Sequence, residues 1–541
     1  MPKRRGSETL ATRPVKRQRP AKPDYLSSLS DEVLLEILSF LPISTLVRCQ
    51  RLSKRFHDLA GDSELWKQKY YARWVLPRSR QALRFKHPIP SPLSTSLGAS
   101  YSPRVSKWPG HGHLATDGKR LNWKTQFRLR HNWSKGTCRF GALEVSRPPL
   151  PQIHMKLYSG VVVTADEEHG LRAWSTKASK KQLTALSFPN KGDKPTALFM
   201  TRGDLASDIE VTVGFEDGRF DIYDLDVARA KFVLRFSQAT SSSSTEGASI
   251  TAIASSPPFL LTISQHQAFS LYRLPHSAAD KPTLLASLES SNTFAPVSLS
   301  LRCSASEVIA SIAYSFFHIS GGWTVGIQEL RFNQDGERIG SRLASTAAFQ
   351  DKTPVSSAAS SRSRSTRHME APTSISYSHP YLLTSHNDNT LTMYLVASSS
   401  DKLSIRPGRR LWGHTSSVTS VQVGDRGKAV SISPRGNEIR IWELETAVSA
   451  RFNSSRSRGG LQSGVREESS VQIAAEHAAT AAVSVETTSG AMNWGREIVQ
   501  AEGETLMPAK VGDCVMFDEE QVVVLRERDC RAQLLECYDF T

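Results

Sequence analysis

The residue types that most often carry covalent or metal chemistry are present in this chain, but their spacing does not support such chemistry. The His-Gly-His run at 111–113 lies among glycine and proline, and no third ligand accompanies it. The six cysteines form no Cys-x-x-Cys pair and no zinc-type series, and they lie at positions 49, 138, 303, 514, 530 and 537. The sequence therefore predicts no metal site.

Motifs for catalysis and cofactor binding are missing as well. The sequence contains no Gly-x-Gly-x-x-Gly run, no P-loop, no His-Glu-x-x-His run and no RING-like series of cysteine and histidine. Isolated Ser, His and Asp residues are plentiful, but they suggest no catalytic constellation. We expect a protein that binds other molecules, without enzymatic activity and without a cofactor.

Cysteine usage and hydropathy indicate the cellular environment. No signal peptide precedes the cysteines, which favours reduced thiols in an intracellular protein. The sequence has no apolar run of about 18 residues, so we expect no membrane span.

The formal net charge of +16 is concentrated in two segments. Residues 1–24 carry eight Lys/Arg against two acidic residues, and residues 71–147 carry fifteen against two. A basic segment suggests nucleic acid or another acidic partner. Tryptophans and Phe127 are interleaved with the basic residues of 71–147, so we expect the aliphatic stems to pack along helices and nucleic-acid binding to be weak or absent.

The first basic segment contains two clusters separated by ten residues. Its composition cannot support a core, so we expect residues 1–24 to be disordered. The clusters resemble a bipartite nuclear-import signal formed by Lys3, Arg4, Arg5, Lys16, Arg17 and Arg19. A solvated basic tail is the alternative. We expect a nuclear and/or cytoplasmic location, with the nucleus favoured.

Residues 25–74 predict a small domain of short helices. Ser30 is a suitable N-cap, Asp31 and Glu32 favour the first helical turn, and Pro42 ends the helix. Apolar residues recur at helical spacing, namely Val33, Leu34, Ile37, Leu38 and Leu41. Short helices with apolar residues on more than one face need a partner for the second face, so this domain is expected to bind another protein.

This segment resembles an F-box. The family pattern has Leu-Pro-x-Glu, Ile-Leu, Leu-Pro, Arg, Lys-x-Trp and Leu-Trp, and it matches Leu29, Glu32, Ile37, Leu38, Leu41, Pro42, Arg48, Lys54, Leu59, Leu65 and Trp66. Ser30 replaces the usual proline and Phe56 the usual tryptophan. The resemblance implies docking to the Skp-family adaptor of a cullin-type SCF ubiquitin ligase through Leu29, Ile37, Leu38, Leu41, Pro42 and Leu46. An ordinary small helical domain is the alternative.

Residues 121–136 resemble the helical connector that joins an F-box to a WD-repeat propeller. The resemblance rests on Trp123, Lys124, Phe127, Arg130, Asn132, Trp133 and Gly136. We assign residues 75–137 to this connector, with a Pro/Ser-rich loop inserted at 87–103.

From Cys138 onward, short β-rich runs alternate with turn residues. Gly413-His414 is followed by Trp442-Glu443, which is the mark of a WD repeat, a four-stranded blade of roughly 40–45 residues. Six degenerate copies comprise a run at 306–330 and runs ending at Trp174, Tyr223, Tyr272, Tyr394 and Tyr538. The fold class is therefore multidomain: a small all-α F-box and connector, followed by an all-β WD-repeat propeller of seven blades over 138–541.

The copies differ from the family pattern at a buried polar position. In WD repeats an Asp six residues before the Trp hydrogen-bonds to the Gly-His imidazole. Asp217 and Asp388 occupy that position in the second and fifth blades, whereas Gly436 occupies it in the sixth. We therefore expect few complete polar networks and a ring held by apolar packing.

Two Ser/Arg-rich segments, near 351–370 and 451–469, interrupt the strand rhythm. They are expected to be disordered loops that offer sites for phosphorylation. The sequence does not place residues 470–500.

The propeller residues that would bind a substrate follow from the same resemblance. Relatives that bind phosphorylated segments often carry an arginine after the aliphatic residue that opens a blade's innermost strand. Small hydroxyl residues occupy this position here, namely Thr196, Thr251, Ser298, Thr373 and Thr419, with Arg172 and Arg219 as further candidates. Their β-propensity alone is the alternative explanation for the hydroxyl series. A ring of phosphate-binding arginines is disfavoured.

These patterns together resemble a fungal-type F-box/WD-repeat protein. The resemblance implies a non-catalytic substrate receptor of an SCF-type E3 ubiquitin ligase, with the Skp-family adaptor and, through it, cullin and a RING subunit as partners. The alternative is a non-ligase nuclear WD-repeat scaffold that binds acidic partners or nucleic acid.

Overall fold

The computed structural model describes residues 25–26, 28–76, 122–146, 152–177, 182–190, 192–203, 208–238, 249–266, 268–275, 281–289, 294–304, 307–319, 322–347, 368–399, 402–433, 438–445, 470–476, 514–527 and 533–541. Among these residues, no helix is both long enough and apolar enough to cross a membrane. The predictions for residues 1–24, 87–103, 111–113 and 451–469 lie outside the described residues, as does most of the 351–370 segment.

The described residues form two compact units. Residues up to 76 and residues 122–127 belong to a helical unit, and residues from 128 onward belong to a unit of strands. One helix, α6 (Trp123–Lys135), contributes its first residues to the helical unit and the rest to the strand unit.

The helical unit consists of short helices, as predicted for residues 25–74. They are α1 (Asp31–Phe40), α2 (Ile43–Cys49), α3 (Lys54–Ala60), α4 (Ser63–Tyr70) and the π-helical turn η1 (Tyr71–Val75). Ser53 accepts a hydrogen bond from the backbone N–H of Phe56 and so caps α3, while the Asp62 carboxylate caps α4. Short polar side chains therefore set where these two helices begin.

Leucine and aromatic side chains form the core of the helical unit. Its buried members are Leu38, Leu46, Ala60, Leu65, Trp66 and Phe127. The Trp66 indole N–H donates to the Ala60 carbonyl at 2.8 Å, and the ring centroids of Trp66 and Phe127 lie 5.2 Å apart. Since Phe127 lies on α6, this helix completes a core that the earlier helices leave open.

The strand unit is a propeller of seven blades, which confirms the predicted fold class and blade number. The first three blades are β2 (His154–Tyr158), β3 (Val161–Asp166), β4 (Gly170–Ser175), β5 (Gln182–Leu186); β6 (Pro195–Arg202), β7 (Asp208–Phe215), β8 (Phe220–Asp226), β9 (Lys231–Ser237); and β10 (Ile250–Ser256), β11 (Phe259–Ser264), β12 (Ala268–Arg273), β13 (Thr283–Glu289).

The next three blades follow in chain order. They are β14 (Phe294–Cys303), β15 (Val308–His318), β16 (Gly322–Phe332), β17 (Arg338–Ser345); β18 (Ser374–Ser378), β19 (Tyr381–Ser385), β20 (Leu391–Ser398), β21 (Leu403–Ile405) with β22 (Arg409–Leu411); and β23 (Ser420–Val423), β24 (Lys428–Ser433), β25 (Glu438–Glu443), β26 (Ser470–Gln472). The start of the unplaced stretch 470–500 thus forms the outer strand of the sixth blade.

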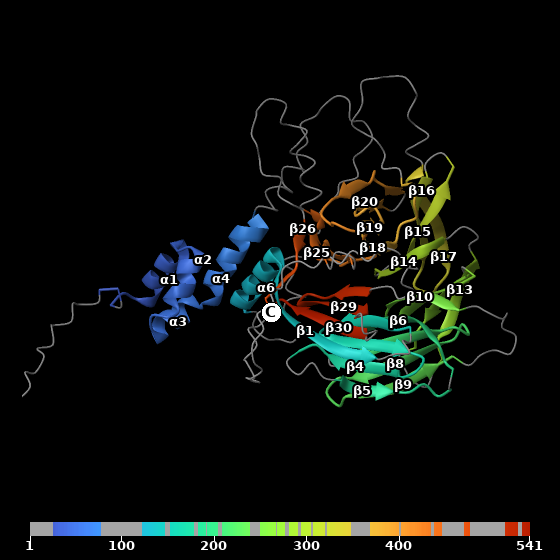
Figure 1. Ribbon diagram of the computed structural model, residues 1–541, viewed down its shortest axis with the longest axis horizontal. Coiled ribbons are helices and arrows are strands. Elements are labelled where there is room, and N and C mark those ends of the chain that lie inside the picture. Colours follow the sequence, from blue (N-terminus) through green and yellow to red (C-terminus); the bar gives the residue numbers. More distant parts are fainter. Residues whose placement is uncertain are drawn as a thin grey trace, which may run out of the picture. The chain divides into compact units, whose positions relative to one another are not determined.

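The seventh blade combines the two ends of the propeller sequence. It contains β28 (Cys514–Phe517), β29 (Gln521–Glu527), β30 (Gln533–Asp539) and β1 (Thr137–Ser146), with the short β27 (Ala474–Glu476) parallel to β1. Leu143 of β1 pairs with Leu535 of β30, and β1 lies beside the C-terminal strands in Figure 1. The first strand of each blade contacts that of the next, and β28 contacts β2, so the ring is closed.

Apolar packing lies between the blades. A buried cluster fills the space between each pair of neighbouring blades, including the pair formed by the seventh and the first. On β3, Val161 and Val163 face the second blade, while Val162 faces the seventh. Each blade is therefore buried on both faces.

The second part of α6 packs against the seventh blade at the point of closure. The Trp133 ring stacks on Phe540 with centroids 4.1 Å apart, and its indole N–H donates to the Glu519 carbonyl at 2.9 Å. The Asn132 amide donates to the Phe540 carbonyl at 2.8 Å. Gly136, at φ +69°, follows the helix, and a Cβ there would collide with the Gln472 carbonyl. Only glycine fits this turn from helix to strand.

The expectation of an incomplete polar network in the sixth blade is wrong. His414 Nε2 lies 2.6 Å from the Ser431 hydroxyl, which also accepts the Trp442 indole N–H at 2.8 Å. His414 Nδ1 lies 3.2 Å from Glu438 Oε2. Glu438 thus supplies the carboxylate that the glycine at 436 does not.

Other blades also hold buried charge pairs, so the ring does not depend on apolar packing alone. Arg172 pairs with Asp166 at 2.7 Å in the first blade, and Glu536 pairs with Arg526 at 3.0 Å in the seventh. At the two positions where we expected an imidazole partner, Asp217 pairs with Arg219 and Asp388 with Arg410.

Replacing Phe540 with alanine should destabilise the closed ring. The side chain is fully buried between Trp133 and the sixth and seventh blades, so we expect the free energy of unfolding to fall by about 3–5 kcal/mol. Urea unfolding of the full chain measures this value. Ile339→Ala on the exposed side of β17 is the control, with an expected change within about 0.5 kcal/mol. Equal losses in both variants would contradict the closure role.

The buried His414 predicts a specific pH dependence of stability. Burial lowers the pKa of His414 from 6.5 to about 4. Below pH 6.5 the unfolded chain binds a proton that the folded chain does not, so stability decreases as the pH falls toward about 4. We expect His414→Gln to weaken this dependence by up to about 1.4 kcal/mol per pH unit. The free energy of unfolding is measured from neutral to mildly acidic pH.

The matched control for this change is His266→Gln, because His266 is exposed on the third blade. It should leave the pH dependence as in the unmodified protein. A His414→Gln profile that is also unchanged would contradict the prediction.

Candidate functional site

Helix α1 carries two apolar stripes on different faces. Leu34 and Leu38 are buried within the helical unit. Val33, Ile37 and Phe40 form the second stripe at i, i+4, i+7 spacing, and all three are exposed, Phe40 by 78%. The described part of the helical unit leaves this second stripe uncovered.

Polar contacts hold α1 at both ends. The Asp31 carboxylate accepts hydrogen bonds from Arg55 Nε at 2.9 Å and Nη2 at 2.6 Å, and Arg55 also donates to the Leu29 carbonyl. At the other end, Lys69 Nζ donates to the Leu41 carbonyl at 2.8 Å. A cation near the carbonyl end of a helix is favourable. These contacts fix which face of α1 points outward.

Exposed apolar side chains also occur elsewhere in the helical unit. Val47 lies on α2 and Leu52 lies between α2 and α3. We define the α1 surface as Val33, Ile37 and Phe40. Soluble proteins rarely leave large aliphatic and aromatic side chains clustered in water without a binding role, so this surface is the candidate docking site.

Two of the residues predicted to face an adaptor are instead inside the helical core. Leu38 is 2% exposed and Leu46 is 0% exposed, and both pack against Trp66. The prediction for these two residues is therefore wrong, because a side chain already enclosed by its own domain presents no surface to a partner.

The other four predicted residues are at least partly accessible. Ile37 and Pro42 are exposed, and Leu29 and Leu41 are half-buried. Their role in docking stays a prediction. The predicted set did not include Val33 and Phe40 of the α1 surface, although their helical spacing from Ile37 was the available signal.

The predicted substrate-binding hydroxyls include three that link neighbouring blades. Thr196 on β6 donates to the Ile250 carbonyl on β10 at 2.6 Å, and Thr373 donates to the Val418 carbonyl at 2.6 Å. The Ser298 hydroxyl on β14 accepts the backbone N–H of Tyr377 at 3.1 Å. These contacts explain hydroxyl residues at strand starts without a ligand. Thr251 is exposed and Thr419 is half-buried.

The two predicted arginines are structural. Arg172 is buried, pairs with Asp166 and donates to the Val145 carbonyl at 2.7 Å. Arg219 is buried among Asp193, Asp217 and Asp221. The prediction that they bind a substrate is wrong, because both side chains are buried and their guanidinium groups are already paired with carboxylates of the propeller.

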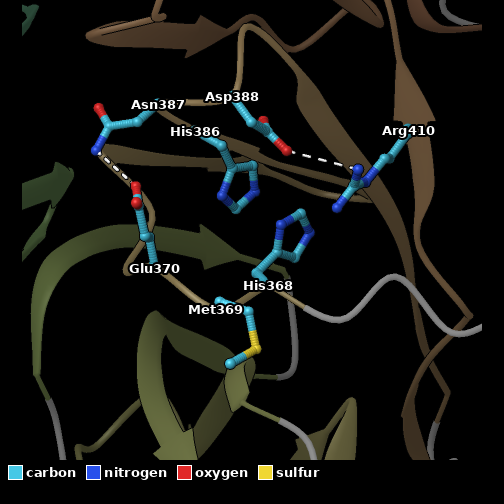
Figure 2. A pocket seen from close by; sticks show the side chains of 7 residues that line it. All are labelled: His368, Met369, Glu370, His386, Asn387, Asp388 and Arg410. Atoms are coloured by element: carbon cyan, nitrogen blue, oxygen red, sulfur yellow. Dashed lines mark hydrogen bonds and ion pairs between the residues drawn. The ribbon is translucent and has the colours of Figure 1, made fainter.

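A pocket of about 340 Å³ lies on the fifth blade. Figure 2 shows its lining, which comprises His368, Met369, Glu370, His386, Asn387, Asp388 and Arg410. The first three precede β18, the next three lie in the turn between β19 and β20, and Arg410 lies on β22. Sequence reasoning missed this pocket, since three separate segments build it and none carries a recognisable motif.

The two histidines of the pocket form a parallel stack. Their ring centroids are 3.7 Å apart with an interplanar angle of 2°. Burial lowers the pKa of His368 to about 4 and that of His386 to about 3, so both imidazoles are neutral at neutral pH. Within the described residues, no group of three or more His, Cys, Asp or Glu could hold a metal ion. The residues that line the pocket can offer a ligand hydrogen bonds and the carboxylates of Glu370 and Asp388.

The predicted import residues Lys3, Arg4, Arg5, Lys16, Arg17 and Arg19 lie outside the described residues.

Comparison with known families matches both units. Residues 138–541 match the family described as the F-box protein pof12 beta-propeller, and residues 26–72 match the F-box-like family. These spans contain the seven blades and the four short helices described above. The family description does not mention WD repeats, so that assignment stays a prediction.

Two relatives support the same conclusion. F-box protein pof12 of Schizosaccharomyces pombe (strain 972 / ATCC 24843) is 22% identical over 445 residues, covering 80% of this chain and 86% of the relative. F-box protein dre-1 of Caenorhabditis elegans is 38% identical over 47 residues, which is 9% of this chain and 5% of the relative. With a family match across the whole propeller and an F-box-like match ahead of it, the chain belongs to the F-box protein pof12 beta-propeller family.

Proposed function

We propose that this chain is the substrate-recognition subunit of an SCF-type E3 ubiquitin ligase. In this proposal the helical unit docks to a Skp-family adaptor, which links the chain to cullin and a RING subunit, and the propeller binds a protein substrate. The observation that carries the proposal is the exposed α1 surface of Val33, Ile37 and Phe40 on an F-box-like unit.

The energetics of the α1 surface suit a protein partner. Burying a large aliphatic or aromatic side chain contributes about 1.5–3 kcal/mol, so three such residues supply much of the affinity of a stable complex. The surface lies on a helix whose ends are fixed by Arg55 and Lys69, so little ordering is needed on binding.

The mechanism in this proposal is proximity. The chain itself forms no covalent bond to ubiquitin or substrate. Holding the substrate and the charged conjugating enzyme in one complex raises the effective concentration of a substrate lysine near the reactive thioester. The contribution of this chain is therefore selection and placement.

We further propose that the basic clusters at Lys3–Arg5 and Lys16–Arg19 direct the protein to the nucleus. The support is their charge and their spacing of ten residues, which suit two acidic grooves of an import receptor.

Replacing Ile37 and Phe40 together with aspartate should abolish adaptor binding. Each substitution removes an apolar contact and adds a charge that would be desolvated in the interface, so we expect a loss of well over tenfold in affinity. Co-purification of the Skp-family adaptor with the tagged chain measures the effect, and urea unfolding checks that the propeller is intact.

Gln68→Asp is the control for adding a carboxylate to the helical unit, because Gln68 is an exposed residue on α4 and the substitution adds one of the two charges that the double variant carries. It should retain the adaptor. Retention of the adaptor at the unmodified level by the double variant would reject the ligase proposal and favour the scaffold alternative.

Replacing Lys16, Arg17 and Arg19 with alanine should shift a tagged protein out of the nucleus, since the second cluster would lose its positive charge. Fluorescence microscopy measures the ratio of nuclear to cytoplasmic signal. Alanine at Arg13 and Lys22, which lie outside both clusters, is the control. An unchanged ratio in the triple variant would reject the import proposal.

A further inference from the structure

The pocket of the fifth blade is connected by backbone pairing to the edge of the fourth. The backbone N–H of Trp323 on β16 donates to the His368 carbonyl at 2.8 Å, and the two residues form an antiparallel bridge. On the other side, Trp323 pairs with Phe317 of β15. Directly opposed residues of antiparallel strands point to the same face, so Phe317, Trp323 and His368 form one row.

Exposed apolar side chains lie on this row and directly beside it in the sequence. Phe317 is 59% exposed and contacts the half-buried Trp323 ring at a centroid distance of 6.1 Å. Met369, next to His368 in sequence, is 82% exposed. We define the apolar shelf as Phe317, Trp323 and Met369. The shelf adjoins the pocket lining, because Met369 follows His368 in the sequence and Trp323 pairs with His368.

The stacked imidazoles leave hydrogen-bonding capacity inside the pocket. His368 Nε2 lies 3.1 Å from the Thr392 hydroxyl, and His386 Nε2 lies 2.9 Å from the Thr384 hydroxyl. Both side chains are more than nine-tenths buried, yet within the described part of the chain neither Nδ1 atom has a hydrogen-bond partner. Each Nδ1 atom can therefore exchange a hydrogen bond with a ligand in the pocket.

The charges of the pocket do not cancel. Arg410 Nη1 and Asp388 Oδ2 lie 3.5 Å apart, so these two groups largely offset each other. Glu370 accepts one hydrogen bond from the Asn387 amide at 3.1 Å, and no cation among the described residues pairs with it. Since the imidazoles are neutral at neutral pH, the described lining of the pocket carries one carboxylate, that of Glu370, without a paired cation among the described residues.

We propose that this pocket binds an arginine side chain of a linear peptide in the protein partner, with a neighbouring apolar residue of that peptide on the apolar shelf. The proposal rests on the proposed function in naming that partner the substrate. Figure 2 shows the stacked rings of His368 and His386 between Glu370 on one side and Asp388 with Arg410 on the other. A guanidinium entering there can donate to the Glu370 carboxylate and to an imidazole nitrogen.

Arginine fits this lining better than the other charged side chains. Its planar guanidinium presents five donors in a fixed fork, which suits a carboxylate and a ring nitrogen at the same time. Lysine offers one compact charge and less geometric match. A phosphorylated residue would bring negative charge close to Glu370, and its repulsion by this carboxylate disfavours it.

The test uses the full-length protein and short synthetic peptide pools that share random flanks and differ in one fixed central residue. The central residues are arginine, lysine, glutamine, glutamate and phosphoserine, each followed by leucine or by serine. We expect the arginine–leucine pool to be retained at least about tenfold more than the glutamate or phosphoserine pools, with lysine between them.

Glu370→Gln should reduce retention of the arginine–leucine pool by about tenfold, because it removes one charge-assisted hydrogen bond. Phe317→Ser should reduce the preference for leucine over serine and leave the preference for arginine. The matched control is Glu168→Gln, an exposed carboxylate on the first blade, which should change neither. Equal retention of all pools, a preference for phosphoserine, or equal effects of Glu370→Gln and Glu168→Gln would overturn the proposal.

Failure of this inference can be distinguished from failure of the ligase proposal. Adaptor co-purification of Glu370→Gln should equal that of the unmodified chain, since Glu370 lies in the propeller. Conversely, the Ile37 and Phe40 double variant should bind the peptide pools normally. If the unmodified chain shows no arginine preference while the double variant loses the adaptor, only the pocket assignment is rejected. If the double variant keeps the adaptor while the arginine preference is present, only the ligase proposal is rejected.

Discussion

The architecture of the strand unit depends on one constraint, which is that every blade is apolar on both faces. Consecutive residues such as Val161, Val162 and Val163 face opposite neighbours, and all are buried. A blade removed from the ring would expose two such faces to water, at a cost of about 1.5–3 kcal/mol for each large side chain. Only a closed circle satisfies all seven blades together. The pairing of β1 with β30 therefore also stabilises the cluster between the seventh and first blades, to which both strands contribute and which an open ring would uncover.

The helical unit also buries apolar side chains in a core, but its described residues leave part of its apolar surface exposed. Its core encloses Leu38, Leu46 and Trp66, and contributions from α6 complete that core. The α1 surface stays outside it. The chain thus contains one unit whose blades cover each other's apolar faces and another whose described residues leave one face uncovered on a helix held at both ends. In the proposed function, the helices dock through apolar contacts, and the propeller pocket selects a ligand through polar contacts beside its apolar shelf.

Much of the fold could be predicted from the sequence because its signals are local. Helical spacing, Ser53, Asp62 and Pro42 locate the short helices, and the β-rich runs locate the blades. The family resemblance implied that Leu38 and Leu46 face a partner. Periodicity could not correct this assignment, because it identifies the faces of a helix but not which face turns inward. The same limit explains the error at the sixth blade, where the carboxylate comes from Glu438 on the strand and not from the turn. Arg172 and Arg219 looked available because their carboxylate partners are recognised only in three dimensions.

The short strand β27 has a consequence for solubility. It follows β26 after one residue, Ile473, and pairs with Thr137, Cys138 and Arg139 at the start of β1. An outermost strand with unpaired N–H and C=O groups is a template on which another chain can add, and such addition leads to aggregation. By continuing from the sixth blade onto the outer edge of the seventh, the chain occupies that template itself at the place where the ring is joined.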